Sequence, residues 1–393
     1  MTLQEIAYGQ NEYVIAVRRA LHQIPELRFE EEETLACIKS KLSKINYEAQ
    51  NYHTLVVKET EGGIWTDFVT NPKYPWLLFR ADVDGLPIEE KTGLLFASKN
   101  NGKMHACGHD IHSAMLLGAI RAIVSGQVVP CYNLRFVFQR AEENPITESG
   151  GLKLVNDGVL LNISRVFGLH IWATGETGVF YSRSGALLGN SDRMQITITT
   201  TGGHVAQPHN GVNALRVAQA IMNSLEGFYN RTLGPVEPAT LEPTILNSGT
   251  ASNVMPAAAV LWYGVRTMLE SKNRDQYLDI LEGQIQTIVT GFPGASVKIN
   301  RILGHPALHN TAEDVEKVYT LLGSLGQKVQ EHQPILGGED FAHYLKNRPG
   351  AFFMLGANQP GCGDHHMPSF NPDEAVLWRG ILFWLCLATQ YKA

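Results

Sequence analysis

Three apolar segments of this sequence contain, or are closely followed by, side chains that can bind cations. The segments and the residues that accompany them are 76–79 with Asp82 and Asp84, 134–139 with Glu142 and Glu143, and 166–172 with His170. Segment 76–79 is apolar throughout, which is typical of a strand that is covered on both faces. Because ligands bind at the carboxyl ends of strands in open α/β sheets, the pattern predicts an α/β fold with a site at that edge.

A further group of polar side chains lies within residues 103–112. Its candidate ligands are His105, Cys107, His109 and His112. An apolar run at 114–120 follows, which indicates a loop that leads into a buried helix. Gly108 allows the backbone to turn tightly between Cys107 and His109. Since loops on a rigid scaffold often carry ligand-binding residues, we expect this loop to join the strand ends in one site.

The length of 393 residues predicts two domains, because single hydrophobic cores stop growing at about 250–300 residues. Between 190 and 303 the pattern is strand, helix, strand, strand, helix, strand, an order typical of a ferredoxin-like α+β domain with an antiparallel sheet. We therefore expect residues 190–303 to be inserted into a catalytic domain that consists of 1–189 and 304–393.

Composition argues against several classes of function. The net charge is -6 at pH 7, and Lys and Arg form no basic stripe, which disfavours a nucleic-acid partner. No apolar segment approaches the roughly 20 residues that span a bilayer, and the first residues lack the pattern of a signal peptide. The five cysteines are scattered, which favours a reducing compartment. We expect a cytoplasmic protein without membrane or nucleic-acid partners.

Metal binding explains the polar side chains better than packing does. The candidates are Asp82, Asp84, Cys107, His109, Glu142, Glu143, His170, His365 and His366. Thiolate, imidazole and carboxylate together suit several ions, among them Zn, Mn, Co and Ni. The set exceeds what one tetrahedral ion needs, so we expect two divalent ions that share a thiolate or a carboxylate. Such a pair activates water and polarises a carbonyl, and a free carboxylate beside it acts as general base. The sequence thus predicts amide hydrolysis.

Residues 104–118 (MHACGHDIHSAMLLG) resemble the signature of the dinuclear metal-dependent amidohydrolases of the aminoacylase/carboxypeptidase-G clan. This branch includes hippurate hydrolases, N-acyl-diaminopimelate deacetylases and auxin-conjugate hydrolases. Further matching motifs lie at 18–22, 80–87, 141–143, 168–170, 202–204, 250–256, 339–341 and 366–368. The resemblance implies a zinc-peptidase-like catalytic domain, whose central mixed sheet is flanked by helices, and an inserted ferredoxin-like domain that serves as a lid or in dimerisation.

The resemblance also implies a role for each matching residue. The implied metal ligands are Cys107, His109, Glu143, His170 and His366, with Cys107 as the bridge. The implied catalytic residues are the general base Glu142 and the ligand-orienting Asp84, and the implied substrate-binding residues are His204, Asn253 and Arg266. The expected substrate is an N-acyl amino acid, attacked by a metal-activated hydroxide. The inserted domain is expected to form a homodimer or higher oligomer, or to close and bring His204 to the site.

Other interpretations stay open on the sequence alone. His365 competes with His366 as a ligand, and the spacing to Pro368 favours His366. The two other histidines of segment 103–112 are interpreted as supporting residues. The activity could also be that of a dipeptidase or aminopeptidase on small peptides. An enzyme that uses Cys107 as nucleophile and a non-catalytic binding protein are the remaining alternatives.

The sequence departs from the family pattern in two places. Residues 144–149 lengthen the link after the paired glutamates, where they border the site and affect substrate choice. Residues 65–75 replace a glycine-rich turn, and we expect them at the surface. The four consecutive acids at 30–33 are interpreted as the solvated start of a helix, where negative charge suits the helix dipole.

Overall fold

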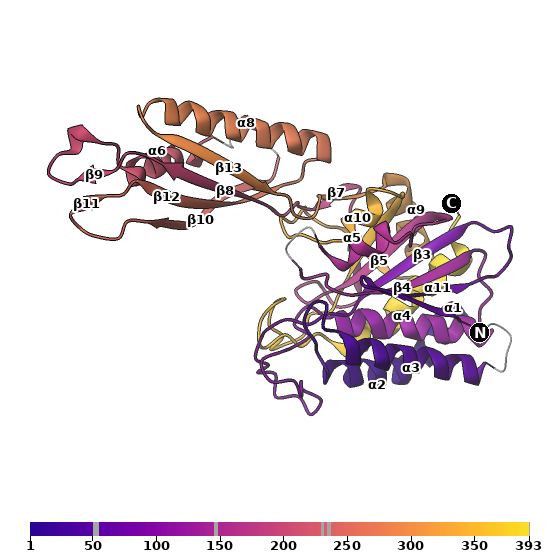
Figure 1. Cartoon of the computed structure of the whole chain (residues 1–393). Helices are drawn as coiled ribbons and strands as arrows, with labels where there is room; N and C mark the ends of the chain where they lie inside the picture. Colours follow the sequence, from indigo (N-terminus) through magenta and orange to yellow (C-terminus); the bar gives the residue numbers. More distant parts are fainter. Residues whose placement is uncertain (50–54, 145–147, 229–231, 234–236, 393) are drawn as a thin grey trace.

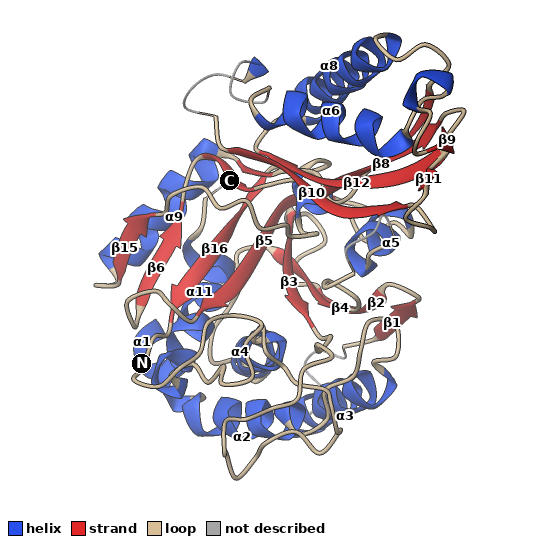
Figure 2. Cartoon of the chain, turned by 90° about the vertical axis from the view of Figure 1, so that its left-hand side faces the viewer, coloured by secondary structure: helices blue, strands red, loops and turns tan. Residues whose placement is uncertain are grey.

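A mixed eight-stranded sheet forms the centre of the molecule, with helices on both faces (Figures 1 and 2). The computed structural model describes residues 1–49, 55–144, 148–228, 232–233 and 237–392. In spatial order the strands are β1 (Val57–Thr60), β2 (Gly63–Phe68), β4 (Asn133–Gln139), β3 (Trp76–Asp82), β5 (Ile163–Trp172), β16 (Gly350–Gly356), β6 (Val179–Ser182) and β15 (Lys328–Glu331). The central strands β4, β3, β5 and β16 are parallel, so their carboxyl ends meet at one edge.

Two hydrophobic clusters cover the faces of this sheet. The helices that contribute to the first are α1 (Leu3–Gly9), α2 (Asn11–His22), α3 (Glu32–Glu48), α4 (His109–Val124), α9 (Ala312–Ser324) and α11 (Leu377–Gln390). Those that contribute to the second are α5 (Gly150–Asn156) and α10 (Ala342–Leu345). In β3, Leu77 and Phe79 belong to the first cluster and Leu78 to the second, because successive side chains of a strand point to opposite faces. Segment 76–79 is therefore a strand that is covered on both faces, as predicted.

A second sheet, fully antiparallel, lies to one side of the first (Figure 1). Its strands in spatial order are β10 (Ala239–Ser248), β12 (Ala258–Thr267), β8 (Asp192–Thr199) and β13 (Ser296–Ile302). Helices α6 (Ala214–Glu226) and α8 (Ser271–Thr290) pack on it through a hydrophobic cluster of their own. The order of these elements along the chain is the expected one. The division into domains at 190 and 303 stays a prediction.

Smaller elements complete the chain. Strands β9 (Gly203–His204) and β11 (Val254–Met255) pair at the tip of the second sheet, and β7 (Gly185–Leu188) pairs with β14 (Leu308–Asn310) near the connection between the sheets (Figure 1). Two short 3-10 helices are η1 (Pro208–Asn210) and η2 (Glu374–Val376). Among the helices that the structure describes, none is long and apolar enough to cross a membrane.

Polar contacts hold the two segments that connect the sheets. Asn190 accepts the backbone N–H of Thr267 at 2.9 Å and donates to the Thr267 hydroxyl at 2.7 Å. Asp192 forms a buried ion pair with Arg274 and accepts the backbone N–H of Gly304 at 3.0 Å. Both connecting segments are thereby tied to strands β8 and β12 at the base of the second sheet.

The surface expectation for 65–75 is wrong for its first part. Trp65 and Phe68 belong to β2 and are only 8% and 4% exposed, because their large side chains pack into the second and the first cluster respectively. Of the unusual link at 144–149, residues 145–147 lie outside the described residues.

Gly118 tests how closely the helices of the first cluster pack. A Cβ atom at Gly118 in α4 would lie 2.5 Å from Cγ2 of Val14 and 3.0 Å from Cδ1 of Ile381. We expect Gly118→Ala to destabilise the protein by about 1–3 kcal/mol through overpacking. Gly283→Ala is the matched control, because this exposed position in α8 has no heavy atom within 4 Å of such a Cβ. It should stabilise by about 0.5–1 kcal/mol through helix propensity. Urea denaturation midpoints measure both, and equal stability of the two variants would contradict the packing argument.

Candidate metal centre

Most of the predicted site residues lie together at the carboxyl edge of the parallel strands. Strand β3 ends at Asp82, β4 ends just before the paired glutamates, and β5 carries His170. Helix α4 begins at His109 beside them. The turn before it requires glycine, because Gly108 has φ +91° and a Cβ there would lie 2.4 Å from Cγ2 of Ile171.

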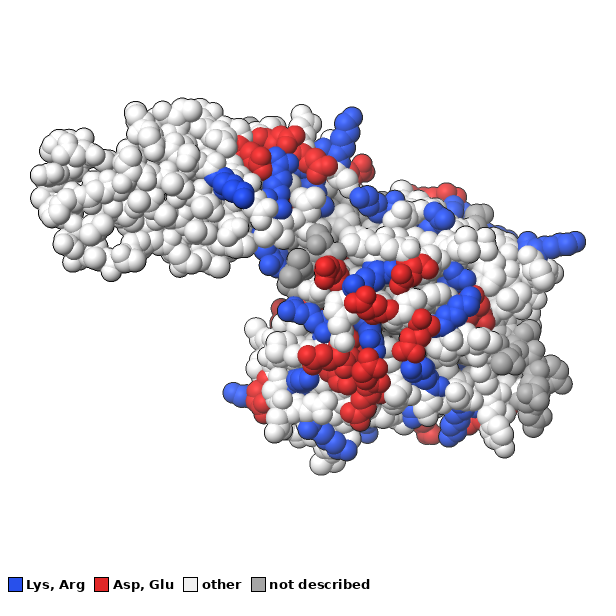
Figure 3. Space-filling view, in the orientation of Figure 1, with Lys and Arg blue, Asp and Glu red and all other residues white. Residues whose placement is uncertain are grey.

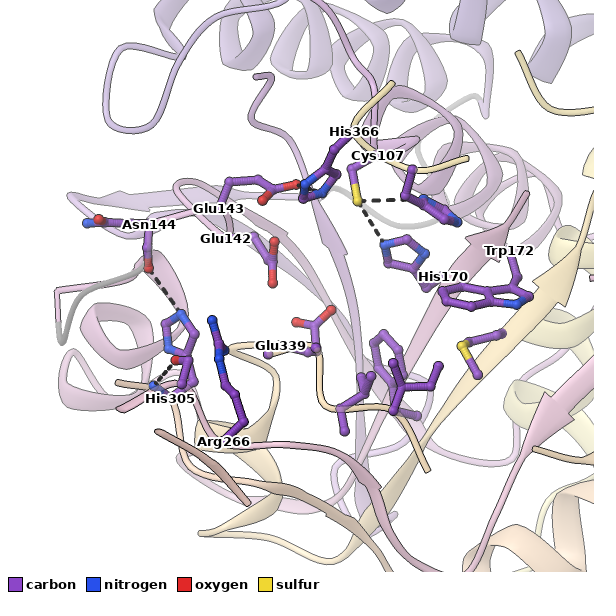
Figure 4. A pocket seen from close by; sticks show the side chains of 18 residues that line it. Cys107, Glu142, Glu143, Asn144, His170, Trp172, Arg266, His305, Glu339 and His366 are labelled. Carbon is purple, nitrogen blue, oxygen red and sulfur yellow. Dashed lines mark hydrogen bonds and ion pairs between the residues drawn. The ribbon is translucent and has the colours of Figure 1, made fainter. Parts of the chain in front are cut away.

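The five predicted ligands form two groups that share Cys107. Figure 4 labels four of them, Cys107, Glu143, His170 and His366. In the first group the ligand atoms of Cys107, His109 and His170 lie within 4.8 Å of one another, and in the second so do those of Cys107, Glu143 and His366. The Sγ atom of Cys107 is 3.4 Å from Nε2 of His170. Nε2 of His366 is 3.0 Å from Oε1 of Glu143. This arrangement suits two neighbouring cations with one common ligand.

Hydrogen bonds orient two of the imidazoles for binding a cation. Nδ1 of His109 donates to Oδ1 of Asp84 at 3.0 Å, and Nδ1 of His170 donates to the carbonyl of Ile171 at 2.5 Å. The second carboxylate oxygen of Asp84 accepts the backbone N–H of Glu143 at 2.9 Å. Partners of this kind fix the tautomer of a metal-binding histidine. Asp84 therefore positions one residue of each group.

Nε2 of His109 provides the sharpest test of the fit to a cation. It is buried and makes no hydrogen bond within the part of the chain that the structure describes. The nearest carboxylate oxygens belong to Asp82 and Glu142, at 3.8 Å and 4.0 Å. An unsatisfied buried nitrogen is costly in a folded protein, whereas a bound divalent ion would satisfy it.

The electrostatics of the site also favour cations. Asp82, Glu142, Glu339 and Asp340 are buried carboxyl groups, and Arg80 contacts three of them at 2.6–3.1 Å. Burial and the negative charges of Glu339 and neighbouring carboxylates raise the pKa of Glu142 well above its usual range. Burial and the nearby glutamates also raise the pKa of the Cys107 thiol. Because a bound cation favours the ionised form of such groups, the residues fit a metal centre.

The remaining histidines near the centre differ in their contacts. Both ring nitrogens of His112 are engaged, with Oδ1 of Asp82 at 2.6 Å and the backbone N–H of Ile171 at 2.8 Å, which agrees with a supporting role. His365 accepts the backbone N–H of Ala173 at 3.1 Å, and its Nδ1 lies 3.9 Å from Sγ of Cys107. The contact between His366 and Glu143 favours His366 as the ligand, and this assignment stays a prediction.

The predicted substrate-binding residues divide into two sets. Arg266 lines a cavity of about 360 Å³ together with Cys107 and Glu142 (Figure 4). His204 and Asn253 are exposed and do not line this cavity. His204 is in β9 and Asn253 directly precedes β11, and both strands lie at the far tip of the second sheet (Figure 1). In the described conformation, the structure therefore brings one of the three residues to the site.

The comparisons with known proteins agree with this geometry. The model of peptidase family M20/M25/M40 matches residues 78–390. The chain belongs to this family. The match confirms the resemblance, and the mixed sheet with flanking helices is the fold of solved M20 relatives. One such structure, the Bacillus subtilis YXEP protein, described as a dinuclear metal binding peptidase from the M20 family, has a TM-score of 0.83 and 28% identity, and 97% of this chain and 98% of that chain are covered.

Curated relatives match this chain over nearly its full length. Thermostable carboxypeptidase 1 of Saccharolobus solfataricus is 32% identical, over 97% of this chain and 96% of that protein. N-acetyl-L-cysteine deacetylase of Bacillus subtilis is 35% identical, over 94% of this chain and 86% of that protein.

Glu31 is a residue of this M20 site that the sequence did not single out. Its neighbours Glu30, Glu32 and Glu33 are exposed, as expected of a solvated helix start, but Glu31 is fully buried. It accepts the backbone N–H of Ala141 at 2.8 Å, and Ala141 has φ +50°, in the left-handed region. Glu31 thus holds the strained turn that precedes the paired glutamates. A run of four identical residues contains no signal for which one is buried.

Removal of the Asp84 charge should weaken metal binding. The two carboxylate oxygens of Asp84 accept one hydrogen bond each, from His109 and from Glu143. An asparagine side chain has only one acceptor oxygen, so Asp84→Asn loses one of these two hydrogen bonds. We expect metal affinity to fall about 10–100-fold, as for other partners of metal ligands. Competition titration with a chromophoric zinc chelator measures it, and Asp157→Asn, at an exposed position, is the matched control. Unchanged affinity in Asp84→Asn would refute the positioning role.

Glu31 should make stability depend on pH. Burial and the charge of Asp84 raise its pKa from 4.5 to about 8. The folded state therefore keeps a proton that the unfolded state loses above pH 4.5, so stability should fall as pH rises from 4.5 to about 8. Glu31→Gln should flatten this dependence in urea denaturation series, whereas the exposed Glu33→Gln should not. A parallel pH dependence in wild type and Glu31→Gln would count against the assignment.

Proposed function

We propose that this protein hydrolyses the amide bond of N-acyl amino acids with two divalent metal ions. The observation that carries the proposal is the shared Cys107 between two ligand groups, with the carboxyl group of Glu142 beside them. It is supported by relatives named N-acetyl-L-cysteine deacetylase and N-acetyldiaminopimelate deacetylase, and by the description of the YXEP protein as dinuclear.

The ligand groups suggest how the ions would be held. Cys107, His109 and His170 would hold one ion, and Cys107, Glu143 and His366 the other. When bound, the ions supply Lewis acidity, which polarises a carbonyl oxygen and lowers the pKa of water. The metal can be Zn, Mn, Co or Ni, because the mixed set of thiolate, imidazole and carboxylate ligands suits each of them.

Glu142 is proposed as the group that moves the proton. Its carboxyl group faces the cavity (Figure 4), and one oxygen lies 4.0 Å from Nε2 of His109. It takes a proton from the attacking water while the oxygen of that water bonds to the acyl carbon. The C–N bond then breaks, and Glu142 returns the proton to the leaving nitrogen. The products are a carboxylate and a free amino acid.

The second sheet is proposed to complete the substrate site. Arg266 would bind the α-carboxylate of the amino acid half by charge-assisted hydrogen bonds. His204 and Asn253 would reach the substrate either by closure of the second sheet or from a second copy of the chain. Strand β10 is an edge strand with exposed Ile245 and Leu246. Edges of this kind pair readily with another chain, so we propose a homodimer through the inserted sheet.

A peptidase activity is the second candidate. The relatives named thermostable carboxypeptidase support it, since a small peptide also presents an amide bond and a terminal carboxylate to the same residues. Nothing in the proposed proton transfer distinguishes an acyl from an aminoacyl group, so both substrates belong in the same assay.

Glu142→Gln tests the proposal directly. We expect it to retain metal, measured by elemental analysis, and to lose about 10²–10⁴-fold in turnover, the usual contribution of a general base. The assay follows release of amino acid from N-acetyl and N-benzoyl amino acids and from dipeptides, with Zn²⁺, Mn²⁺ or Co²⁺ added. Glu316→Gln, on the exposed side of α9, is the matched control.

Chelation in the same assay separates the alternatives. Activity that a chelator removes and metal restores supports the proposal. Chelator-resistant activity that is lost on alkylation of Cys107 would instead establish a thiol nucleophile. If none of the substrates is hydrolysed with any metal, the proposed activity is wrong.

A further inference from the structure

A histidine outside the proposed ligand set contacts the segment that carries the paired glutamates. Nε2 of His305 donates to the backbone carbonyl of Asn144 at 3.0 Å (Figure 4). In the chain, Asn144 directly follows the proposed general base Glu142 and the proposed ligand Glu143. His305 is only 4% exposed, and a hydrogen bond is stronger in such a water-poor environment. No motif of the sequence singled out His305, and the proton transfer assigned to Glu142 does not use it.

The contact with His305 completes the support of this segment. Glu31 and Asp84 accept backbone N–H groups at the start and the middle of the segment, at 2.8 Å and 2.9 Å. Neither of them reaches its carboxyl end. Within the part of the chain that the structure describes, His305 is the one hydrogen-bond partner of the Asn144 backbone. The segment is therefore held at three points, and His305 provides the last.

The protonation of the His305 ring follows from its neighbours. A carbonyl oxygen can only accept, so Nε2 carries the proton. Burial lowers the pKa of His305, so the ring is neutral and Nδ1 has a free lone pair. Nδ1 lies 3.4 Å from Nε2 of His343, and the two rings meet edge to face, with centroids 5.6 Å apart and an angle of 87°. This contact restricts rotation of the ring and keeps Nε2 directed at Asn144.

The backbone of His305 belongs to one of the two segments that connect the sheets, between β13 and β14. It pairs with Ser191 of the other connecting segment. The His305 N–H donates to the Ser191 hydroxyl at 2.9 Å, and the His305 carbonyl accepts the Ser191 N–H at 3.2 Å. The segments are in close contact, because a Cβ atom at Gly304 would overlap the carbonyl oxygen of Ser191. The place of the His305 ring is therefore determined where the second sheet joins the first.

We infer that His305 is a positioning residue for the proposed hydrolysis. It holds the Asn144 carbonyl so that Glu142 and Glu143 keep their places at the proposed metal centre, and it makes those places depend on how the second sheet is joined to the first. The inference rests on the proposed function, which assigns the two glutamates their roles. Because His305 acts on the segment of Glu143 and contacts no residue of the other ligand group, its loss should affect one metal ion more than the other.

Metal titration tests the inference without turnover. His305→Leu removes the donor, whereas His305→Gln places an amide nitrogen near the position of Nε2. We expect His305→Leu to weaken one of two zinc-binding steps about 10–100-fold, as for other partners of metal ligands, and His305→Gln to retain most of the wild-type affinity. Competition with a chromophoric chelator measures both steps. His305→Asn, whose amide is too short to reach Asn144, replaces the leucine variant if that variant does not fold.

His309→Leu is the matched control. Nε2 of His309 also donates to a carbonyl in the connecting region, that of Met268 at 3.0 Å, and its described contacts do not include residues 141–144. This variant loses a hydrogen bond of the same kind, so we expect both zinc-binding steps and turnover to stay at the wild-type values.

Kinetics of the zinc-saturated full chain provide a second measurement, with the N-acyl amino acid that the wild type hydrolyses fastest. Because a misplacement of about 1 Å can cost about 100-fold in rate, we expect kcat to fall about 10–100-fold in His305→Leu. KM should change little, since Arg266 keeps its place, and His305→Gln should recover most of kcat. Ser191→Ala should lower kcat in the wild type but have no further effect in His305→Leu, because Ser191 acts through His305.

The possible failures differ from one another. Unchanged zinc binding and kcat in His305→Leu overturn the inference, and so do equal weakening of both zinc-binding steps, a loss that His305→Gln does not recover, or an equal loss in His309→Leu. The proposed function stands in each of these cases. If the wild type binds two zinc ions but hydrolyses none of the substrates, the proposed function fails, and the titration still decides whether His305 positions Glu143. If the wild type binds no metal, both fail.

Discussion

The burial of several carboxylates at one sheet edge is the constraint on which the site depends. Arg80 lowers the energetic cost of this burial, because its guanidinium contacts Asp82, Glu339 and Asp340 at 2.6–3.1 Å. Gln139 at the end of β4 donates to Asp340 at 2.8 Å, so β3, β4 and the segment before α10 are joined. Buried charges survive only when they are paired and hydrogen-bonded. Arg80 pairs only some of the acids, and the charge that remains faces the cavity as a site for cations.

Asp84 connects the buried carboxylates of the scaffold to the proposed ligands by hydrogen bonds. One carboxylate fixes the tautomer of His109 and also holds the backbone of Glu143, which belong to different ligand groups. Glu31 acts from the other side of the same turn through Ala141. The spacing of the two groups around Cys107 is therefore determined by residues that lie behind them. The chemistry proposed for Glu142 needs this spacing, since proton transfer requires hydrogen-bond distances.

The same strands separate polar from apolar parts of the cavity. Alternation along β5 places His170 and Trp172 on one face, so a proposed ligand and a half-buried tryptophan come from consecutive positions of that face. Arg266 comes instead from β12 of the second sheet. Both sheets therefore contribute side chains to the cavity, and the arrangement of the second sheet determines where Arg266 lies.

The sequence by itself determined the α/β class, the order of elements in the second sheet and the candidate ligands, because apolar periodicity and the clustering of Cys, His and acidic residues are local signals. It also pointed to His112 as a supporting residue. The burial of Glu31 and of Trp65 could not be predicted, since both depend on packing between segments distant in sequence. Only the tertiary structure decided that Asp84 joins the two ligand groups, that His204 lies away from the cavity, and that Trp172 lies beside the centre. Each of these follows from strand register and from the orientation of the second sheet, which no local pattern encodes.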